Sequence, residues 1–363
     1  MSQDRKRLVI IGGGHAGVRF IHVFNQKRPN SQYDIVLIDK KDFYELNFFN
    51  LWDLVAPRDL KGNHRIPYTD FIKGNFMQGT VIELTKTEVI LESGGHIPYD
   101  YAIISTGTSY PRFSYAKSDS QSSEEMRKKV DTEHELLQEA RSILIIGGGS
   151  VGVELAGGIK ARIPHLEVQL VDMAPVLLSR LHPKAQKAAY NILNELGVKV
   201  YLNESVDLEN TNGTIYKTSS GKRLSADRVY FTIGPKLNTQ FMTAYFSSSI
   251  SESGEILVSN EFRVKNTENL FSLGDCAATG DPKHGSFTLI QGAFLASNFN
   301  NLISRKSIKS YKHKPLVTIV PVGDEKGIIQ IGKKVIVGKF FTKIKHSKFF
   351  LNYVRKSVGI PNI

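Results

Sequence analysis

Cysteine is almost absent from this 363-residue chain, which holds Cys276 alone. A disulfide within the chain is therefore excluded, and so is a catalytic Cys-x-x-Cys pair. No run of about 18 apolar residues occurs, so the sequence offers no membrane-spanning helix. The histidines show no spacing typical of metal ligands, and we expect no metal. An apolar share of 41% is ordinary for a globular protein, and the length suits two or three domains.

The first residues leave little room for a targeting segment. They are polar as far as Arg7 and run straight into an apolar stretch, which is too short for a signal or transit peptide. Residue 2 is Ser2 rather than Gly, which excludes N-myristoylation. We therefore expect a cytoplasmic protein, with any membrane association peripheral.

Acidic residues are scarce at the end of the chain. Residues 301–363 hold 14 Lys and Arg but only Asp324 and Glu325, which accounts for the whole net charge of +12. Such a basic segment favours an acidic partner, either a membrane surface, an acidic protein or nucleic acid. A solvated basic face without a partner is the plain alternative.

A glycine-rich pattern follows the first apolar run. Residues 8–11 predict a buried strand, and Gly12, Gly14 and Gly17 follow as G-x-G-x-x-G before a helical pattern. Residues 35–38 predict the next strand, which ends at Asp39, about 20 residues beyond the glycines. This order is typical of a βαβ unit that binds a dinucleotide. The pyrophosphate lies at the helix N-terminus, and the carboxylate accepts hydrogen bonds from a ribose.

The same pattern recurs later in the chain. Residues 142–146 predict a strand, Gly147, Gly149 and Gly152 form the motif, and Asp172 closes the following strand. Two complete units predict two dinucleotide sites, one for a bound flavin dinucleotide and one for an exchanging nicotinamide. A carboxylate at Asp172 accepts from a free 2′-hydroxyl and repels a 2′-phosphate, so we expect NADH, with NADPH left open.

Three further strand ends complete an ordered set of motifs: Thr106-Gly107, Gly234 and Gly274-Asp275. Over about residues 7–300 this order resembles the pyridine nucleotide-disulfide oxidoreductase superfamily. Within it, residues 76–81, 147–154 and 345–358 are similar to the AIF-like NAD(P)H:quinone oxidoreductases, the family of the ferroptosis suppressor proteins.

The resemblance implies an α/β fold with two Rossmann-like three-layer domains, the NAD domain inserted in the FAD domain. We expect residues 1–112 and 246–305 to form the FAD-binding domain and residues 113–245 the NAD(P)H-binding domain. Residues 306–363 would then form a small, basic α+β region.

The resemblance also implies roles for matching residues. The FAD site is expected to include Gly12, Gly13, Gly14, His15, Ala16, Gly17, Asp39, Lys40, Val81, Thr106, Gly107, Gly274, Asp275 and Gln291. The nicotinamide site is expected to include Gly147, Gly149, Gly152, Asp172 and Gly234. Glu154 would be the catalytic residue that reaches the nicotinamide beside the flavin, while Lys345 and Phe350 match positions near a quinone site.

Three of these residues have plainer interpretations. Glu154 is also an ordinary first-turn helix carboxylate, and Gln291 is also a plain residue near a helix start. Trp52 occupies the position where relatives often carry an FAD-binding arginine, and its indole either stacks on the flavin or quinone or lies in the core, which its apolar neighbours in sequence favour. The sequence departs from the family pattern at this point.

The end of the chain predicts strands within residues 316–341 and then a helix over residues 343–358. Ile344, Phe350, Leu351, Val354 and Val358 share one stripe of this helix, and most of its lysines lie outside the stripe. A basic amphipathic helix of this kind lies on an anionic membrane. The alternative is that the stripe packs on the protein's own core.

The sequence therefore predicts an FAD-dependent enzyme that passes a hydride from NADH to a quinone at a membrane surface. Two alternatives remain: a reductase of a small acidic electron-carrier protein, and a flavin-sensing factor that binds protein or nucleic acid. Nucleic acid is the least expected partner, because the basic region lacks the regular aromatic spacing of a single-strand platform. The oligomeric state is left open, a homodimer included.

Overall fold

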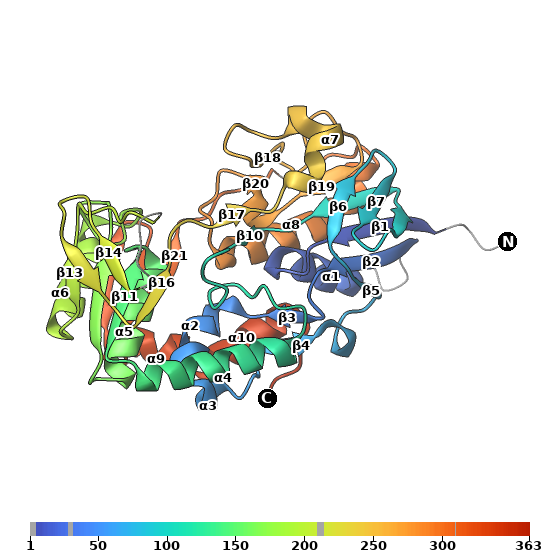
Figure 1. Ribbon diagram of the computed structural model, residues 1–363. Helices are drawn as coiled ribbons and strands as arrows, with labels where there is room; N and C mark the ends of the chain where they lie inside the picture. Colours follow the sequence, from blue (N-terminus) through green and yellow to red (C-terminus); the bar gives the residue numbers. More distant parts are fainter. Residues whose placement is uncertain (1–4, 28–31, 209–213, 309) are drawn as a thin grey trace.

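The computed structural model describes residues 5–27, 32–208, 214–308 and 310–363. Ser2 lies outside these ranges. The chain builds two lobes, each around a parallel β-sheet, and its last residues run from one lobe back to the other (Figure 1). The predicted fold class is thereby confirmed.

The first lobe is built on a five-stranded parallel sheet of order β19-β9-β1-β2-β5. Side chains of β1 alternate between its faces, as strand geometry requires. Leu8 and Ile10 pack on helices, while Val9 and Ile11 pack on a three-stranded antiparallel sheet. The lobe is therefore three layers thick. Its elements are β1 (Lys6–Ile11), α1 (His15–Lys27), β2 (Tyr33–Asp39), β5 (Asn75–Gln78), β6 (Val81–Leu84), β7 (Glu88–Leu91), β8 (His96–Pro98), β9 (Tyr101–Ile104), β19 (Leu270–Ser272) and α8 (Gly285–Ile303).

The second lobe is built on a four-stranded parallel sheet of order β13-β12-β11-β16. Along the chain it lies between β9 and β19 of the first sheet. The two connecting segments, β10 (Thr108–Ser109) and β17 (Lys236–Leu237), pair antiparallel where the chain enters and leaves the lobe. Its main elements are β11 (Ser142–Ile146), α5 (Ser150–Arg162), β12 (Glu167–Val171), α6 (Pro183–Glu195), β13 (Lys199–Tyr201), β14 (Ile215–Lys217), β15 (Arg223–Ser225) and β16 (Arg228–Phe231).

Shorter elements join the lobes and cover their edges. Helix α4 (Ser123–Glu139) begins as its sequence indicates, because Ser122 Oγ accepts a hydrogen bond from the Glu125 amide. The other short elements are β3 (Phe43–Glu45), α2 (Asn50–Val55), α3 (Pro57–Leu60), β4 (Arg65–Pro67), α7 (Thr243–Phe246), β18 (Ile256–Leu257) and β20 (Ala277–Ala278).

The last part of the chain forms an antiparallel sheet followed by two helices. Strands β21 (Val317–Val322), β22 (Lys326–Ile331) and β23 (Lys334–Gly338) pair in sequence order, in agreement with the strands predicted for this region. Val320, Val322 and Ile328 join the core of the second lobe, so this sheet packs on the second lobe rather than standing alone.

The predicted single helix over residues 343–358 is wrong. Helix α9 (Lys339–Lys345) ends with His346 as its C-cap. Helix α10 (Lys348–Ser357) then begins anew with Ser347 as its N-cap, whose hydroxyl accepts from the Phe350 amide at 3.1 Å. A serine preceding a helix start satisfies an amide that would otherwise lack a partner, which favours the break at this position.

The apolar stripe of this region packs inside the protein. Leu351, Val354 and Val358 are 1–2% exposed and lie in the core of the first lobe, beside α1. Their burial removes apolar area from water, which stabilises the folded chain by about 1.5–3 kcal/mol per side chain. The expectation that this stripe lies on a membrane is therefore wrong, and the stripe instead joins the C-terminus to the first lobe.

Candidate functional site

A single cavity of about 1410 Å³ runs between the two lobes. It lies where parallel strands of both sheets end, the edge at which such sheets bind ligands. Most of the predicted site residues line it, although they come from segments far apart in the chain. They are Gly12, Gly13, Gly14, His15, Ala16, Asp39, Lys40, Val81, Thr106, Gly107, Gly147, Gly149, Glu154, Asp172, Gly234, Gly274, Asp275 and Lys345.

The glycines of each motif have different tasks. Gly12 has φ +98°, and a Cβ there would lie 2.6 Å from the Ser105 carbonyl oxygen, so the turn requires glycine. Gly152 does not line the cavity, but a Cβ on it would lie 1.9 Å from the Gly147 carbonyl oxygen. Gly17 likewise stands behind the cavity, against the Gly12 carbonyl. The third glycine of each motif thus lets helix and strand pack closely, as the pattern predicts.

The acids that close the second strand of each unit hold the glycine turn. Asp39 accepts hydrogen bonds from the amides of Gly13 at 2.6 Å and Lys41 at 2.8 Å. Asp172 accepts in the same way from Gly148 and, at 2.6 Å, from Ala174. Both carboxylates also line the cavity. The two units therefore repeat one construction, in which an acid on the cavity wall fixes the glycine turn.

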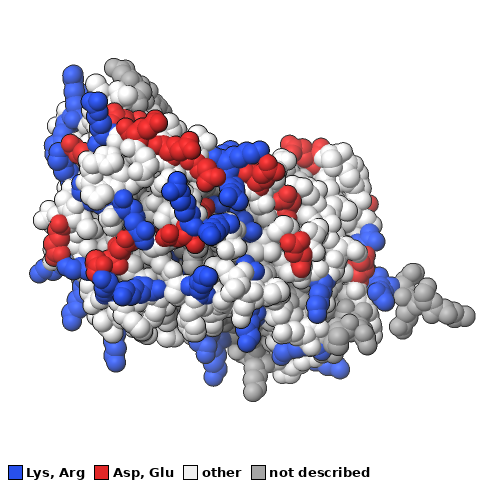
Figure 2. All heavy atoms as spheres, turned by 90° about the horizontal axis from the view of Figure 1, so that it is seen from below, with Lys and Arg blue, Asp and Glu red and all other residues white. Residues whose placement is uncertain are grey.

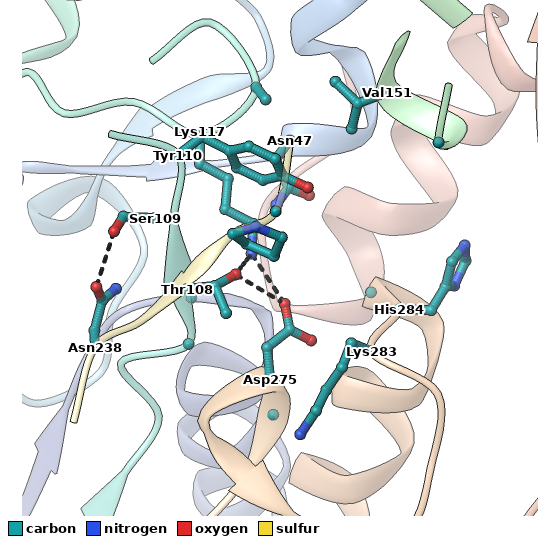
Figure 3. Close-up of a pocket in the computed structure, with 18 of the residues that line it drawn as sticks. Asn47, Thr108, Ser109, Tyr110, Lys117, Val151, Asn238, Asp275, Lys283 and His284 are labelled. Carbon is teal, nitrogen blue, oxygen red and sulfur yellow. Dashed lines mark hydrogen bonds and ion pairs between the residues drawn. The ribbon is translucent and has the colours of Figure 1, made fainter. Parts of the chain in front are cut away.

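Asp275 lies on the cavity wall, and one oxygen of its carboxylate is hydrogen-bonded while the other is unpaired. Its Oδ2 accepts from Lys117 Nζ at 2.9 Å and from Thr108 Oγ1 at 3.4 Å (Figure 3). Burial acts to raise the pKa of this carboxyl, but the charge and hydrogen bond of Lys117, the Lys283 charge and the Thr108 hydrogen bond together lower it. Its buried Oδ1 has no hydrogen-bond partner among the described residues. A charged acceptor of this kind fits a hydroxyl-bearing ligand.

Glu154 and Lys345 were predicted separately, and the fold brings them together. Lys345 Nζ lies 2.6 Å from Glu154 Oε2, and the side chains are 12% and 11% exposed. Burial raises the pKa of Glu154, an effect that the Lys345 charge opposes. This ion pair joins α5 of the second lobe to the end of α9. Phe350 does not line the cavity; its ring packs on Phe48 and Phe49, with centroids 5.9 and 5.7 Å away.

Gln291 is not at the cavity, and its assignment to the FAD site is wrong. Helix α8 begins at Gly285, so Gln291 lies well inside the helix and is 2% exposed. Its amide accepts from the Gly274 amide at 2.8 Å and donates to Asp281 at 2.9 Å. It supports the turn of Asp275 from behind. The helix start that faces the cavity carries His284, Gly285 and Thr288 instead.

Trp52 is half-buried at the junction of the lobes and does not line the cavity. The Arg162 guanidinium lies 4.5 Å from its ring centroid, and the ring also contacts His346. The structure thus agrees with the packing interpretation of this indole rather than with stacking on a flavin.

His15 stands within the first glycine motif and is 7% exposed. Its Nε2 lies 2.8 Å from Asn47 Oδ1, its Nδ1 bonds the Tyr44 hydroxyl, and its ring stacks on Phe48. Burial lowers the pKa of His15 to about 4, so the ring is neutral near pH 7. It provides a polar but uncharged wall to the cavity.

Among the residues that the structure describes, no three His, Cys, Asp or Glu side chains gather in a way that could hold a metal ion. Within the same residues, no helix is long and apolar enough to cross a membrane.

Comparison with known proteins agrees with this geometry. The family described as pyridine nucleotide-disulphide oxidoreductase matches residues 6–296. The chain belongs to this family. Its predicted likeness to the ferroptosis suppressor and AIF-like proteins is also confirmed. Apoptosis-inducing factor homolog B of Dictyostelium discoideum is 29% identical over 375 residues, which cover 96% of this chain and 95% of that protein. Ferroptosis suppressor protein 1 of Xenopus tropicalis is 28% identical over 369 residues, covering 98% and 97%.

Solved structures of this pyridine nucleotide-disulphide oxidoreductase type share the fold. The sulfide:quinone oxidoreductase from Aquifex aeolicus matches with a TM-score of 0.78 at 17% identity, covering 97% of this chain and 92% of that one. NDH2 from Plasmodium falciparum, solved with NADH, matches with a TM-score of 0.76 at 14% identity and covers 99% and 100%. This family member is therefore an FAD-dependent oxidoreductase of NAD(P)H.

Two features of the cavity fit FAD. The turn at Gly12 leaves no space for a Cβ, and the unpaired Oδ1 of Asp275 is a buried acceptor that a ribityl hydroxyl would satisfy. Lys117, which fixes the other oxygen of Asp275, was missed by the sequence analysis because no motif surrounds it. Its partner lies 158 residues further along the chain.

We expect Asp275→Ala to lose flavin, because the variant removes a charged hydrogen-bond acceptor worth about 1.5–3 kcal/mol. FAD should bind roughly 10- to 100-fold more weakly, measured by fluorescence of flavin released on dilution. Asp70→Ala, at an exposed position, serves as the control. Full flavin retention by Asp275→Ala would show that Asp275 does not contact the cofactor.

Proposed function

We propose that the protein oxidises NADH and passes two electrons, through bound FAD, to a quinone. The observation that supports this most is the continuous cavity that joins both glycine motifs, with the Glu154–Lys345 pair on its wall. When bound, FAD supplies the ring that accepts a hydride and releases electrons to a second substrate. The chain's own residues bind and orient the cofactor and the substrates, and they exclude water from the reacting groups.

For FAD, we assign the cavity-lining residues of the first lobe. The motif from Gly12 to Ala16 would receive the pyrophosphate at the start of α1, where amides point outward and the helix dipole favours an anion. Asp39 would hold the ribose, and Asp275 the ribityl chain. Lys40, Val81, Thr106, Gly107 and Gly274 would complete the wall.

For the nicotinamide, we assign Gly147, Gly149, Gly234 and Asp172 as contacts, with Gly152 shaping the turn. Glu154 follows on α5, where its carboxylate would meet the nicotinamide end. Glu204 is a second acid beside Asp172, because its amide donates a hydrogen bond to the Asp172 carbonyl at 3.0 Å and Glu204 lines the same cavity. This second acid also favours NADH over NADPH. A 2′-phosphate would meet two carboxylates there.

Asp172→Ser should narrow the preference for NADH over NADPH. Removing one carboxylate lowers the repulsion of a 2′-phosphate, and we expect the ratio of kcat/KM values to fall about tenfold, or ~1.4 kcal/mol. Steady-state kinetics with both donors measure this, with Glu167→Ser on the exposed end of β12 as the control. An unchanged ratio of kcat/KM values would show that the 2′ group of the donor does not lie beside Asp172.

For the acceptor, a quinone fits the mixed apolar and polar lining of the cavity. Phe48, Leu51 and Leu316 are among the apolar residues of its wall, and apolar walls with placed polar groups are common in small-molecule sites. The test is to purify the protein, record its visible spectrum, and follow NADH oxidation with and without duroquinone. A yellow protein whose NADH oxidation depends on duroquinone is expected. A colourless protein that cannot be reconstituted with FAD, or an NADH-reduced protein that duroquinone does not reoxidise, contradicts the proposal.

We also propose peripheral membrane association, through the outer face of α10 rather than its buried stripe. Phe349 and Tyr353 are 76% and 62% exposed and lie four residues apart on this face, together with Lys356. The face of the molecule on which α3, α4 and α10 lie carries both signs of charge (Figures 1 and 2). Several basic residues after residue 300 are already paired, Lys326 with Glu195 and Lys339 with Glu325. The aromatic side chains would therefore contribute more than net charge alone.

A further inference from the structure

Four polar side chains from four different elements meet on the wall of the cavity. Glu154 comes from α5, Lys345 from the end of α9, Thr318 from β21, and His284 from the residue before α8. Phe48 contacts His284, with ring centroids 6.4 Å apart. Glu154 and Lys345 satisfy each other at 2.6 Å. His284 and Thr318 form a second, uncharged pair on the same cavity.

The hydrogen bonds of His284 indicate which ring nitrogen carries the proton. Its Nδ1 caps α8, because it accepts from the Ser286 amide at 3.4 Å and lies 2.9 Å from Ser286 Oγ. A nitrogen that accepts from an amide carries no hydrogen, so in the neutral ring the hydrogen is on Nε2. Nε2 lies 3.2 Å from Thr318 Oγ1, which accepts from it. Nδ1 thus caps helix α8, and Nε2 donates a hydrogen bond inside the cavity.

The surroundings keep this ring neutral. The pKa of His284 is lowered to about 4, mainly by burial and then by the nearby Lys345 charge, while Asp275 acts in the opposite direction. Lys283 and His284 project from the start of α8 in opposite directions (Figure 3). Lys283 turns to the Ala277 carbonyl and to Glu255, at 2.6 Å each, so it does not supply a charge to the ring.

We propose that His284 donates a hydrogen bond from Nε2 to a carbonyl oxygen of the electron acceptor. This bond replaces the one that Nε2 donates to Thr318 when no acceptor is bound. This rests on the proposed function as a quinone reductase. A neutral imidazole fixed at a helix N-terminus polarises a carbonyl without losing its own proton. Its bond strengthens as negative charge develops on that oxygen, so it favours the transition state over the bound substrate.

The reaction balances in electrons and protons without a proton from His284. A quinone becomes a hydroquinone by gaining two electrons and two protons. The hydride of NADH brings two electrons and one proton, and water supplies the second proton to the oxygen that His284 holds. NADH becomes NAD⁺, and His284 returns to Thr318 when the hydroquinone leaves.

The test separates the two halves of the reaction in the holoenzyme. In His284→Leu, reduction of bound flavin by NADH and its reoxidation by ferricyanide, which has no carbonyl, should keep their wild-type rates. Reoxidation by duroquinone should fall about 100-fold, the typical loss for one donor to a developing oxyanion. Duroquinone should also bind the oxidised holoenzyme more weakly by calorimetry without NADH. His284→Gln, which retains an N–H at a similar distance, should recover most of the rate, and the exposed His165→Leu should match wild type.

Three outcomes would overturn the inference. Equal duroquinone rates and affinities in His284→Leu and wild type would show that the donor is not used. Equal slowing with ferricyanide and duroquinone would show that His284 acts on the flavin or the fold. A wild-type enzyme that reacts with NADH but not with duroquinone would overturn both this inference and the proposed acceptor, whereas the first two outcomes leave the proposed function standing.

Discussion

Lys345→Met should destabilise the holoenzyme by about 3 kcal/mol, the lower part of the 3–5 kcal/mol typical for breaking a buried ion pair. The variant leaves the Glu154 carboxylate without its partner, at 11% exposure. The matched control is Lys343→Met, on the exposed side of the same helix α9. Urea unfolding of both variants and wild type, followed by flavin release and circular dichroism, measures the difference.

This loss should depend on pH. Burial already raises the pKa of Glu154, and without Lys345 nothing on that side chain opposes the effect. The folded state then holds a proton that the unfolded state releases above its ordinary pKa of about 4.3. Stability therefore falls as pH rises through the interval between the two pKa values, and the gap to wild type should be larger near pH 8 than near pH 5.

A double variant distinguishes the pair from its surroundings. Glu154→Leu with Lys345→Met removes both charges, and such replacements are often neutral or stabilising. It should therefore be more stable than Lys345→Met alone, although it should lose NADH oxidation. A Lys345→Met protein with wild-type stability at both pH values would show that water in the cavity already solvates Glu154.

The parts of the fold that follow local rules were predictable. In each βαβ unit the strand, the glycine turn, the helix and the closing acid lie within a short stretch of chain, so the pattern of Gly12, Gly17 and Asp39 determines the turn and the packing together. Asp275 was found for the same reason, because a glycine and an acid directly follow a buried strand.

Residues that meet across long stretches of chain could not be found in this way. Lys117 meets Asp275 from a loop without a motif, and the contact of Glu154 with Lys345 spans 191 residues. Gln291 was assigned wrongly because α8 is apolar on most sides, so its start is hard to read from periodicity. The N-cap of α8 is His284, which is not among the usual Ser, Thr, Asp and Asn. A search for any polar side chain before the helix would have included His284.

The two faces of α10 should respond to mutation in opposite ways. Leu351→Ala and Val354→Ala empty space in the core of the first lobe. A buried Leu→Ala typically costs 2–5 kcal/mol, so Leu351→Ala should lower the midpoint of urea unfolding and speed the loss of FAD. Removal of residues 343–363 should prevent the first lobe from folding stably. Phe349→Ser with Tyr353→Ser changes only exposed side chains and should leave stability within about 0.5 kcal/mol of wild type.

Membrane binding should follow the outer face alone. Flotation with vesicles that contain phosphatidylserine, at low and high salt, measures it. Wild type and Leu351→Ala, kept at a temperature where both are folded, should float at low salt and less at high salt, since salt screens Lys348 and Lys356. The Phe349→Ser, Tyr353→Ser protein should stay at the bottom of the gradient while retaining FAD. If it floats as wild type does, the aromatic pair is not the contact. If wild type does not float at either salt concentration, the basic region serves an acidic electron-carrier protein instead, and turnover with such a carrier should then exceed turnover with duroquinone.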